Sequence, residues 1–127
     1  MPGRRRWRRG QSRRAVRMLE PTLLLLLHDS PAHGYTLLEE LDYFGLGELH
    51  ASVVYRALRD MEDRGWLTST WEEEETQGPP RRVYYLTARG DETLAHWTSD
   101  LEETQALIDR LLASYRRHMQ AGEGDFH

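Results

Sequence analysis

Apolar side chains recur at alternating steps of three and four residues through the last third of the chain. These positions hold Leu94, Trp97, Leu101, Thr104, Ile108, Leu111 and Tyr115. Such a heptad spacing places its members along one seam of an α-helix, with a polar interruption at Thr104. At about 1.5 Å per residue, a helix from Thr87 to His118 would be roughly 45–50 Å long.

A helix of that length exceeds the width of the small head that precedes it in a chain of 127 residues. Much of the seam would therefore be exposed in a monomer. A second copy of the chain is the simplest cover, because symmetric dimers are the commonest closed assemblies. The alternative is a helix packed along its whole length on its own head. We expect the homodimer, with an interface formed by Leu94, Trp97, Leu101, Ile108, Leu111 and Tyr115.

Five consecutive leucines, Leu23 to Leu27, predict a helix at the buried centre of the head, because such a run faces every direction. The run is much shorter than the roughly 20 apolar residues of a membrane span. We expect the helix to begin at Glu20-Pro21, where proline is tolerated in the first turn, and to stop at Ser30-Pro31.

Two further helices and a hairpin are expected before the long helix. The second helix covers 32–44 and ends at Gly45 and Gly47, and the third covers 51–64, is capped by Ser52 and closes at Gly65. Segments rich in β-formers at 67–71 and 81–86 predict a hairpin with a long acidic tip. This order predicts a mainly α (α+β) fold: a winged helix-turn-helix with a two-stranded wing and a long C-terminal dimerisation helix.

Within that fold we expect four regions. Residues 1–18 form a disordered arm, 19–86 a winged-helix DNA-binding domain, 87–119 a dimerisation helix and 120–127 a flexible tail.

The third helix has the pattern of a DNA recognition helix. Its apolar stripe consists of Val54, Ala57, Leu58 and Met61. The other side carries Ser52, Val53, Arg56 and Arg59. An arginine can donate two hydrogen bonds to guanine, and valine methyls can pack on thymine in the major groove. The alternative is a solvated surface helix.

Arg81 and Arg82, at the start of the second strand, predict contacts between the wing and a phosphate or the minor groove. The acidic residues Glu72 to Glu75 repel DNA, so we expect the base of the wing to make these contacts. The alternative for the acidic run is a solvated loop.

Arginines crowd the start of the chain, where no acidic residue precedes Glu20. They are Arg4, Arg5, Arg6, Arg8, Arg9, Arg13, Arg14 and Arg17. The whole chain nevertheless has a net charge of −4. A basic arm on an acidic body indicates a nucleic-acid partner, and Arg4, Arg5 and Arg6 are candidate contacts. The alternatives are the arginine preference of a GC-rich genome and a solubilising tail.

Cysteine is absent, which excludes disulfides and thiolate metal sites and fits a cytoplasmic protein. The six histidines are scattered without the spacing of a metal site, and the sequence has no HExxH motif or phosphate-binding loop. We therefore expect no enzyme, no metal and no cofactor.

Several segments resemble the PadR family of bacterial transcriptional regulators, in its short subfamily. They are Pro31-Ala32-His33-Gly34-Tyr35, Val54-Tyr55-Arg56-Ala57-Leu58, Gly65-Trp66-Leu67 and Val83-Tyr84-Tyr85-Leu86-Thr87 with Gly90. The resemblance implies a winged-helix head, a C-terminal dimerisation helix and usually repression, relieved in some members by small aromatic or multidrug-like ligands. It also implies that DNA is met by Tyr35, Ser52, Tyr55, Arg56 and Arg59, with Arg81 and Arg82 in the wing.

We therefore expect a sequence-specific regulator, a repressor that binds a palindromic operator in double-stranded DNA as a homodimer. Trp97 lies near the seam, where it either stacks on a planar ligand or serves packing alone. The alternative function is a winged-helix interaction module that acts on another regulator without binding DNA.

Overall fold

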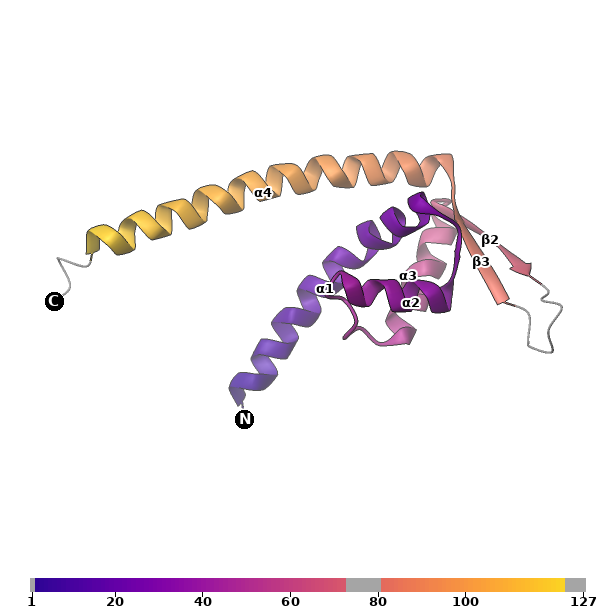
Figure 1. Cartoon of the computed structure of the whole chain (residues 1–127), viewed down its shortest axis with the longest axis horizontal. Coiled ribbons are helices and arrows are strands. Elements are labelled where there is room, and N and C mark those ends of the chain that lie inside the picture. Colours follow the sequence, from indigo (N-terminus) through magenta and orange to yellow (C-terminus); the bar gives the residue numbers. More distant parts are fainter. Residues whose placement is uncertain (1, 73–80, 123–127) are drawn as a thin grey trace. The chain divides into compact units, whose positions relative to one another are not determined.

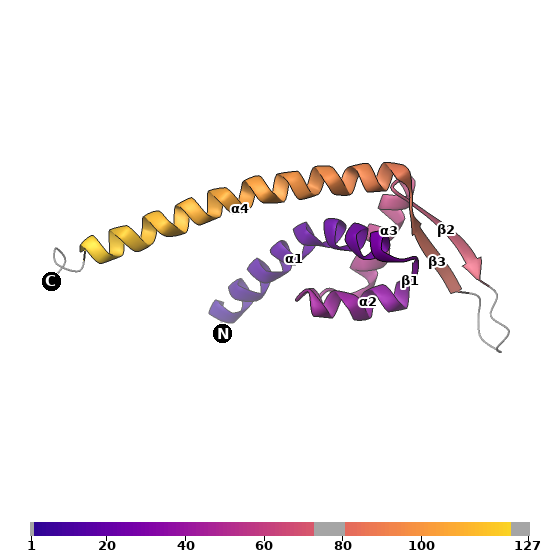
Figure 2. The ribbon, with the colours of Figure 1, turned by 45° about the horizontal axis from the view of Figure 1, so that its top comes forward.

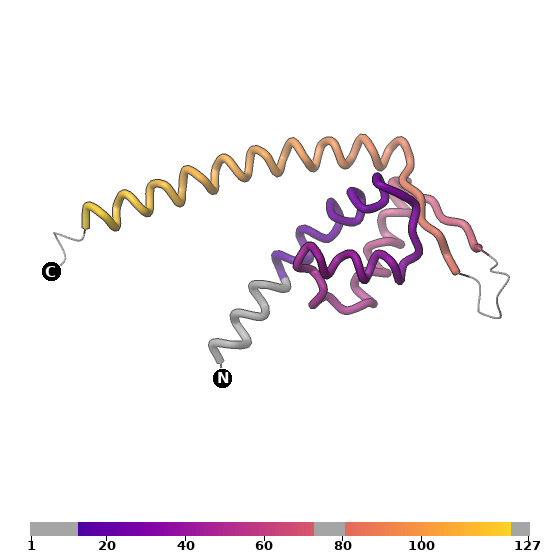
Figure 3. The backbone as a smooth tube through the Cα atoms, viewed as in Figure 1, coloured from indigo at the N-terminus to yellow at the C-terminus, as the bar shows by residue number. Residues whose placement is uncertain are grey.

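The computed structural model describes the backbone of residues 2–72 and 81–122, and the side chains of residues 13–72 and 81–122 (Figure 3). The elements are α1 (Pro2–Asp29), β1 (Ala32–His33), α2 (Gly34–Tyr43), α3 (Ala51–Asp63), β2 (Leu67–Glu72), β3 (Arg81–Leu86) and α4 (Ala88–Gly122) (Figure 1). The chain forms two compact units, residues 1–94 and 95–127. The predicted order of three helices, a hairpin and a long helix is confirmed.

The core of the first unit lies where α1, α2 and α3 meet. Its fully buried side chains include Leu23, Leu24, Leu37, Leu41, Val54, Leu58 and Met61. The leucine run contributes much of this core, but it is not buried on every side, because Leu25 is 46% exposed. The helix was expected to be buried on all sides, but one of its faces is exposed to solvent.

Helix α1 begins at Pro2, far before the expected start at Glu20, and Pro21 lies inside it. Residues 2–18, which were predicted to be disordered, are therefore helical. Leu19 is buried at the same four-residue step that connects Leu23 and Leu27. Its burial stabilises the helix by roughly 1.5–3 kcal/mol. That is the same size as the ~3 kcal/mol that an interior proline costs.

The wing belongs to a three-stranded antiparallel sheet in the order β1-β3-β2. A two-stranded wing was expected, and residues 32–33 were assigned to the second helix. Instead, Ala32 pairs with Tyr84 and His33 with Val83, and α2 begins only afterwards, at Gly34 (Figure 2). The strand is too short to leave a periodic signal in the sequence.

Glycines close α2 and α3 as predicted. Gly65 has φ 82° and follows the C-cap of α3, and the N–H of Trp66 donates to the carbonyl of Met61 at 2.9 Å. This is the geometry of a Schellman motif, which requires a left-handed residue. The predicted N-cap of α3 was wrong: His50 occupies that position instead of Ser52 and makes no side-chain cap hydrogen bond.

Thr87 caps α4 and ties its start to the turn after α3. The N–H of Gly90 donates to the Thr87 hydroxyl at 3.0 Å, and that hydroxyl lies 2.7 Å from the carbonyl oxygen of Gly65. The N–H of Thr87 donates to the carbonyl of Trp66 at 3.1 Å. The predicted start of the long helix is confirmed, while its end lies beyond the expected His118.

Candidate nucleic-acid interface

Helix α3 presents two chemically different sides. Val54, Leu58 and Met61 are buried, so the predicted apolar stripe packs into the core. Ser52, Arg56 and Arg59 are exposed, and Val53 is half-buried beside them. The side chains expected to meet base edges are therefore accessible, as that role requires.

Residues from α2, α3 and the wing converge on one hollow of about 360 Å³. It is lined by His33, Gly34, Tyr35, Tyr55, Arg81, Arg82 and Tyr84. Four of the predicted DNA contacts lie here, although their positions run from 35 to 82 in the sequence. Tyr35, at the start of α2, is 65% exposed. The sequence did not reveal that these side chains share a hollow.

Arg82 is oriented by its neighbours in the wing. It pairs with Trp71 across the β2–β3 register, and its guanidinium carbon lies 4.9 Å from the centroid of the Trp71 ring. It is also hydrogen-bonded to Tyr84, and its Nε atom is buried without a hydrogen-bond partner. A planar guanidinium stacked on an aromatic face keeps its outer donors available for a phosphate.

Tyr84 also lines the hollow and is buried. Burial raises the pKa of Tyr84 above the ordinary tyrosine value, and the hydrogen bond and charge of Arg82 partly offset that increase. The side chain is therefore a neutral phenol at physiological pH. Its strand partner Ser69 donates to the Glu62 carboxylate at 2.8 Å, which connects β2 to α3.

The loop end of the wing, where Glu72 pairs with Arg81, also approaches the residue that precedes α2. Nε2 of His33 lies 3.5 Å from Oε2 of Glu72. The Glu72 side chain is 53% exposed, so this contact lies at the surface and Glu72 remains solvated. Residues 73–75 of the acidic run lie outside the described part of the chain.

The arginine-rich start of the chain is part of α1. The side chains of the candidate contacts Arg4, Arg5 and Arg6 lie outside the described residues. Arg13, Arg14 and Arg17 are described and exposed. The arginines of the expected basic arm therefore belong to a helix.

The distal part of α4 carries an exposed apolar face. Ile108, Leu111 and Tyr115 are exposed, with Leu111 at 66%, whereas Leu94, Trp97 and Leu101 are partly exposed. The exposed set also includes residues that the seam left out: Leu107, Leu112 and Met119. Leu107 precedes the seam residue Ile108, and Leu112 follows the seam residue Leu111. Their apolar character indicates a wider face, which a strict heptad count overlooks.

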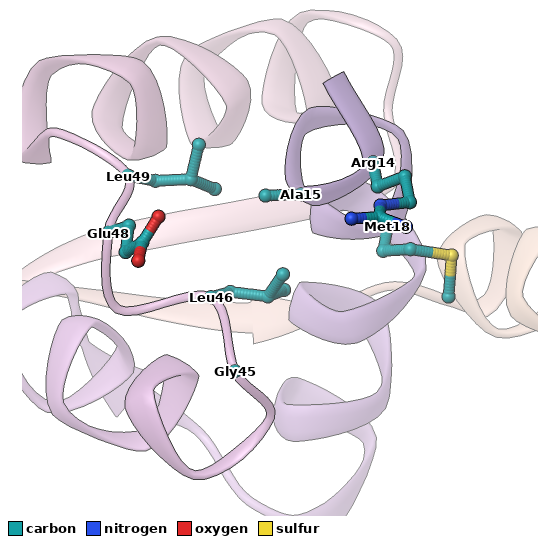
Figure 4. Close-up of a pocket in the computed structure, with 7 residues that line it drawn as sticks. All are labelled: Arg14, Ala15, Met18, Gly45, Leu46, Glu48 and Leu49. Carbon is teal, nitrogen blue, oxygen red and sulfur yellow. The ribbon is translucent and has the colours of Figure 1, made fainter. Parts of the chain in front are cut away.

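A second hollow, of about 290 Å³, lies between α1 and the segment after α2. It is lined by Arg14, Ala15, Met18, Gly45, Leu46, Glu48 and Leu49. Figure 4 shows Ala15 and Leu46 between Glu48 on one side and Arg14 on the other. No sequence motif pointed to this hollow, because its lining comes from segments without periodic pattern.

Within the described ranges, no three histidine, aspartate or glutamate side chains are grouped so that they could hold a metal ion. No helix in the same ranges combines the length and apolar character needed to cross a membrane.

Comparison with solved structures shows where this architecture occurs. A PadR family transcriptional regulator from Eggerthella lenta superposes with a TM-score of 0.73 at 24% identity, covering 88% of this chain and 97% of that chain. A PadR-like transcription factor from Bacteroides fragilis gives 0.66 at 28% identity, covering 81% and 98%. A PadR-like regulator from Bacillus cereus gives 0.67 at 23% identity, covering 75% and 91%.

The sequence itself matches the family. The profile of the transcriptional regulator PadR-like family covers residues 23–96, which is more than half of the chain. No curated protein matches significantly. The expected short subfamily stays a prediction, because the match covers the family as a whole. This chain belongs to the PadR-like family of transcriptional regulators, which are winged-helix DNA-binding proteins and not enzymes.

Proposed function

We propose that this protein is a sequence-specific repressor that binds a palindromic operator as a homodimer. One observation carries the proposal: Tyr35, Tyr55, Arg81 and Arg82 meet at one hollow, and Arg56 and Arg59 of the helix that contributes Tyr55 are exposed. Phosphate contacts position a protein on DNA, and base contacts give it specificity. A head that exposes donors of both kinds suits sequence-specific binding.

The proposed roles follow from position. Arg56 and Arg59 read guanine edges, and Ser52 and Val53 meet bases near the start of α3. Tyr35, Tyr55, Arg81 and Arg82 contact the sugar-phosphate backbone, and Arg4, Arg5 and Arg6 add charge to it. The second copy of the chain packs on the apolar face of α4. The resulting two-fold dimer presents two recognition helices to two half-sites of the operator.

To test the proposal, DNA fragments that the protein binds are selected from a genomic library. Fluorescence anisotropy then measures the affinity of the protein for the selected duplex and for a scrambled one. A specific regulator binds its selected duplex at least about a thousandfold more tightly than scrambled DNA. Its affinity falls with salt by nearly one log–log unit for each phosphate contacted. Equal affinity for selected and scrambled duplexes would contradict the proposal and favour the interaction module, which needs no DNA.

We also propose that a small aromatic ligand releases the repressor by stacking on Trp97 near the dimer seam. Aromatic rings provide large apolar contact surfaces for planar ligands. The test is the operator affinity of the wild type and of Trp97→Leu during titration with planar aromatic compounds. Release of the wild type alone supports the role; release of both or of neither excludes it.

A further inference from the structure

His33 brings a titratable group to the hollow between α2, α3 and the wing. It is the last residue of β1, directly before α2, and its side chain lines the hollow. This side chain is 24% exposed, and its Nδ1 atom is buried without a hydrogen-bond partner. Histidine is the residue whose charge ordinarily changes between about pH 5 and about pH 8. None of the roles proposed above uses this residue.

The carboxylate of Glu72 has two basic neighbours on one face of the sheet. Its Oε2 atom lies 3.5 Å from Nε2 of His33. The strand register places Glu72, at the end of β2, opposite Arg81, at the start of β3, and paired residues in antiparallel strands project from the same face. His33 pairs with Val83, two positions along β3 from Arg81, so the two-residue period of a strand places it on this face as well. One carboxylate thus serves both the histidine and an arginine that is proposed to contact DNA.

The other groups around His33 are basic or phenolic. The elements packed against β1 are α2 and β3. The titratable side chains that line the hollow together with His33 are Tyr35 of α2, Tyr55 of α3, and Arg81, Arg82 and Tyr84 of β3. The two guanidinium groups oppose a positive charge on the imidazole, and Glu72 favours it. Burial raises the pKa of Tyr84, so this phenol carries no charge near neutral pH. A polyanion that approaches the two arginines would favour the protonated imidazole.

We propose that His33 and Glu72 form a pH-sensitive control on DNA binding, in which protonation of His33 offsets the charge of Glu72 at the loop end of the wing. The inference deepens the proposed function and rests on it. While His33 is neutral, the carboxylate of Glu72 weakens the attraction between Arg81 and a phosphate. When His33 is protonated, its positive charge compensates this carboxylate. The affinity for DNA therefore rises as the pH falls, because the complex holds more protons than the free protein.

The expected size of the effect follows from the number of protons and from the exposure of the pair. One proton taken up on binding changes the affinity by at most about tenfold per pH unit. The Glu72 side chain is 53% exposed, so water and salt screen its interaction with His33. We expect the affinity of the wild type for its selected duplex to rise about fivefold between about pH 7.5 and about pH 5.5.

The test consists of fluorescence anisotropy titrations of the selected duplex across this pH range at constant ionic strength. The proteins are the wild type, His33→Gln, Glu72→Gln and two matched controls, His28→Gln and His50→Gln. Nε2 of His28, at the end of α1, lies 3.6 Å from Oδ1 of Asp91, and His50 is exposed at the N-cap of α3. Both controls lie outside the lining of the hollow. Circular dichroism at both ends of the pH range verifies that each variant is folded.

The variants have distinct expected outcomes. His33→Gln should change its affinity by less than about twofold across the range, because glutamine takes up no proton. Glu72→Gln should bind more tightly than the wild type at about pH 7.5, because the opposing carboxylate is gone, and should gain less on acidification. The two control variants should keep the wild-type response. A full response retained in His33→Gln, or a response lost in His50→Gln and not in His33→Gln, would overturn the proposal.

A scrambled duplex separates this control from the proposed function, because charge interactions with phosphates do not depend on the base sequence. Equal affinity for the selected and scrambled duplexes, with a pH response that His33→Gln removes, would support the control and contradict sequence-specific recognition. Selective binding with a pH response that His33→Gln leaves unchanged would support the proposed function and overturn the control. A protein that binds neither duplex would overturn both.

Discussion

Gly90, in the first turn of α4, lies directly against the backbone carbonyl of Trp66 in the turn that follows α3. A Cβ atom at Gly90 would collide with that carbonyl oxygen and would also lie 2.6 Å from Cδ1 of Leu86. The contact joins the first turn of α4 to the turn after α3 through backbone atoms, which cannot move aside as a flexible side chain can. The position therefore admits only glycine.

We expect Gly90→Ala to reduce the free energy of unfolding by roughly 1–3 kcal/mol, the usual cost of overpacking. Ser99→Ala, at an exposed position of the same helix, should stay within about 0.5 kcal/mol of the wild type. Urea unfolding at one fixed protein concentration measures both, because the stability of an oligomer depends on concentration. Equal stability of the two variants would contradict the close contact.

The raised pKa of Tyr84 predicts that the free energy of unfolding falls at alkaline pH. Burial raises its pKa in the folded protein, so the unfolded chain gives up the phenol proton at lower pH than the folded one does. The stabilising contribution of the neutral phenol is fully present below about pH 10, the ordinary tyrosine pKa, and declines as the pH rises through the folded pKa.

Urea unfolding from about pH 8 to about pH 11 tests this difference in wild type and Tyr84→Phe. The wild type should lose stability more steeply than the variant above about pH 10, since phenylalanine has no proton to release. Parallel curves for the two proteins would show that Tyr84 titrates alike in the folded and unfolded states.

Arg56 tests the proposed recognition helix. We expect Arg56→Ala to weaken binding to the selected operator by roughly 1–3 kcal/mol and to relax the preference at one base pair. Because Arg56 is exposed, the fold should be retained. Anisotropy titrations compare it with Arg110→Ala on α4 as the matched loss of one arginine. An Arg56→Ala affinity equal to that of the control would remove this residue from base recognition.

Deletion of the basic start of the chain tests whether its arginines add affinity for DNA of any sequence. Ala15 is the first buried residue among the described side chains of α1, and a deletion of residues 1–12 removes five arginines while it keeps Ala15. We expect the deletion to weaken binding to specific and scrambled duplexes by the same factor and to lower the salt slope. A loss confined to the operator would indicate that these arginines read bases.

Leu111 tests the dimer. We expect Leu111→Glu to shift the protein towards monomers, because it places a charge in the apolar face of α4 where the partner would pack. Arg110→Glu introduces the same residue one position away, outside the exposed apolar set, and should leave the association unchanged. Sedimentation equilibrium measures both. A wild type that stays monomeric at high concentration would exclude the homodimer.

Local patterns in the sequence were sufficient for the helical stripe of Val54, Leu58 and Met61, the left-handed end of α3 at Gly65 and the start of α4 at Thr87. Each depends on residues a few positions apart, whose spacing or backbone preference is written directly into the chain. The heptad seam also follows from local spacing. The exposed apolar face on α4 is wider than the seam, because it includes Leu107, Leu112 and Met119.

Tertiary packing decided the remaining features. The passage of α1 through Pro21 depends on burial of Leu19 against the head, and β1 exists because β3 offers it a partner. The hollow depends on the approach of Tyr55 to Gly34, two residues from different helices. Propensity and periodicity describe neighbours along the chain, whereas these contacts gain their free energy only when distant segments are already packed together.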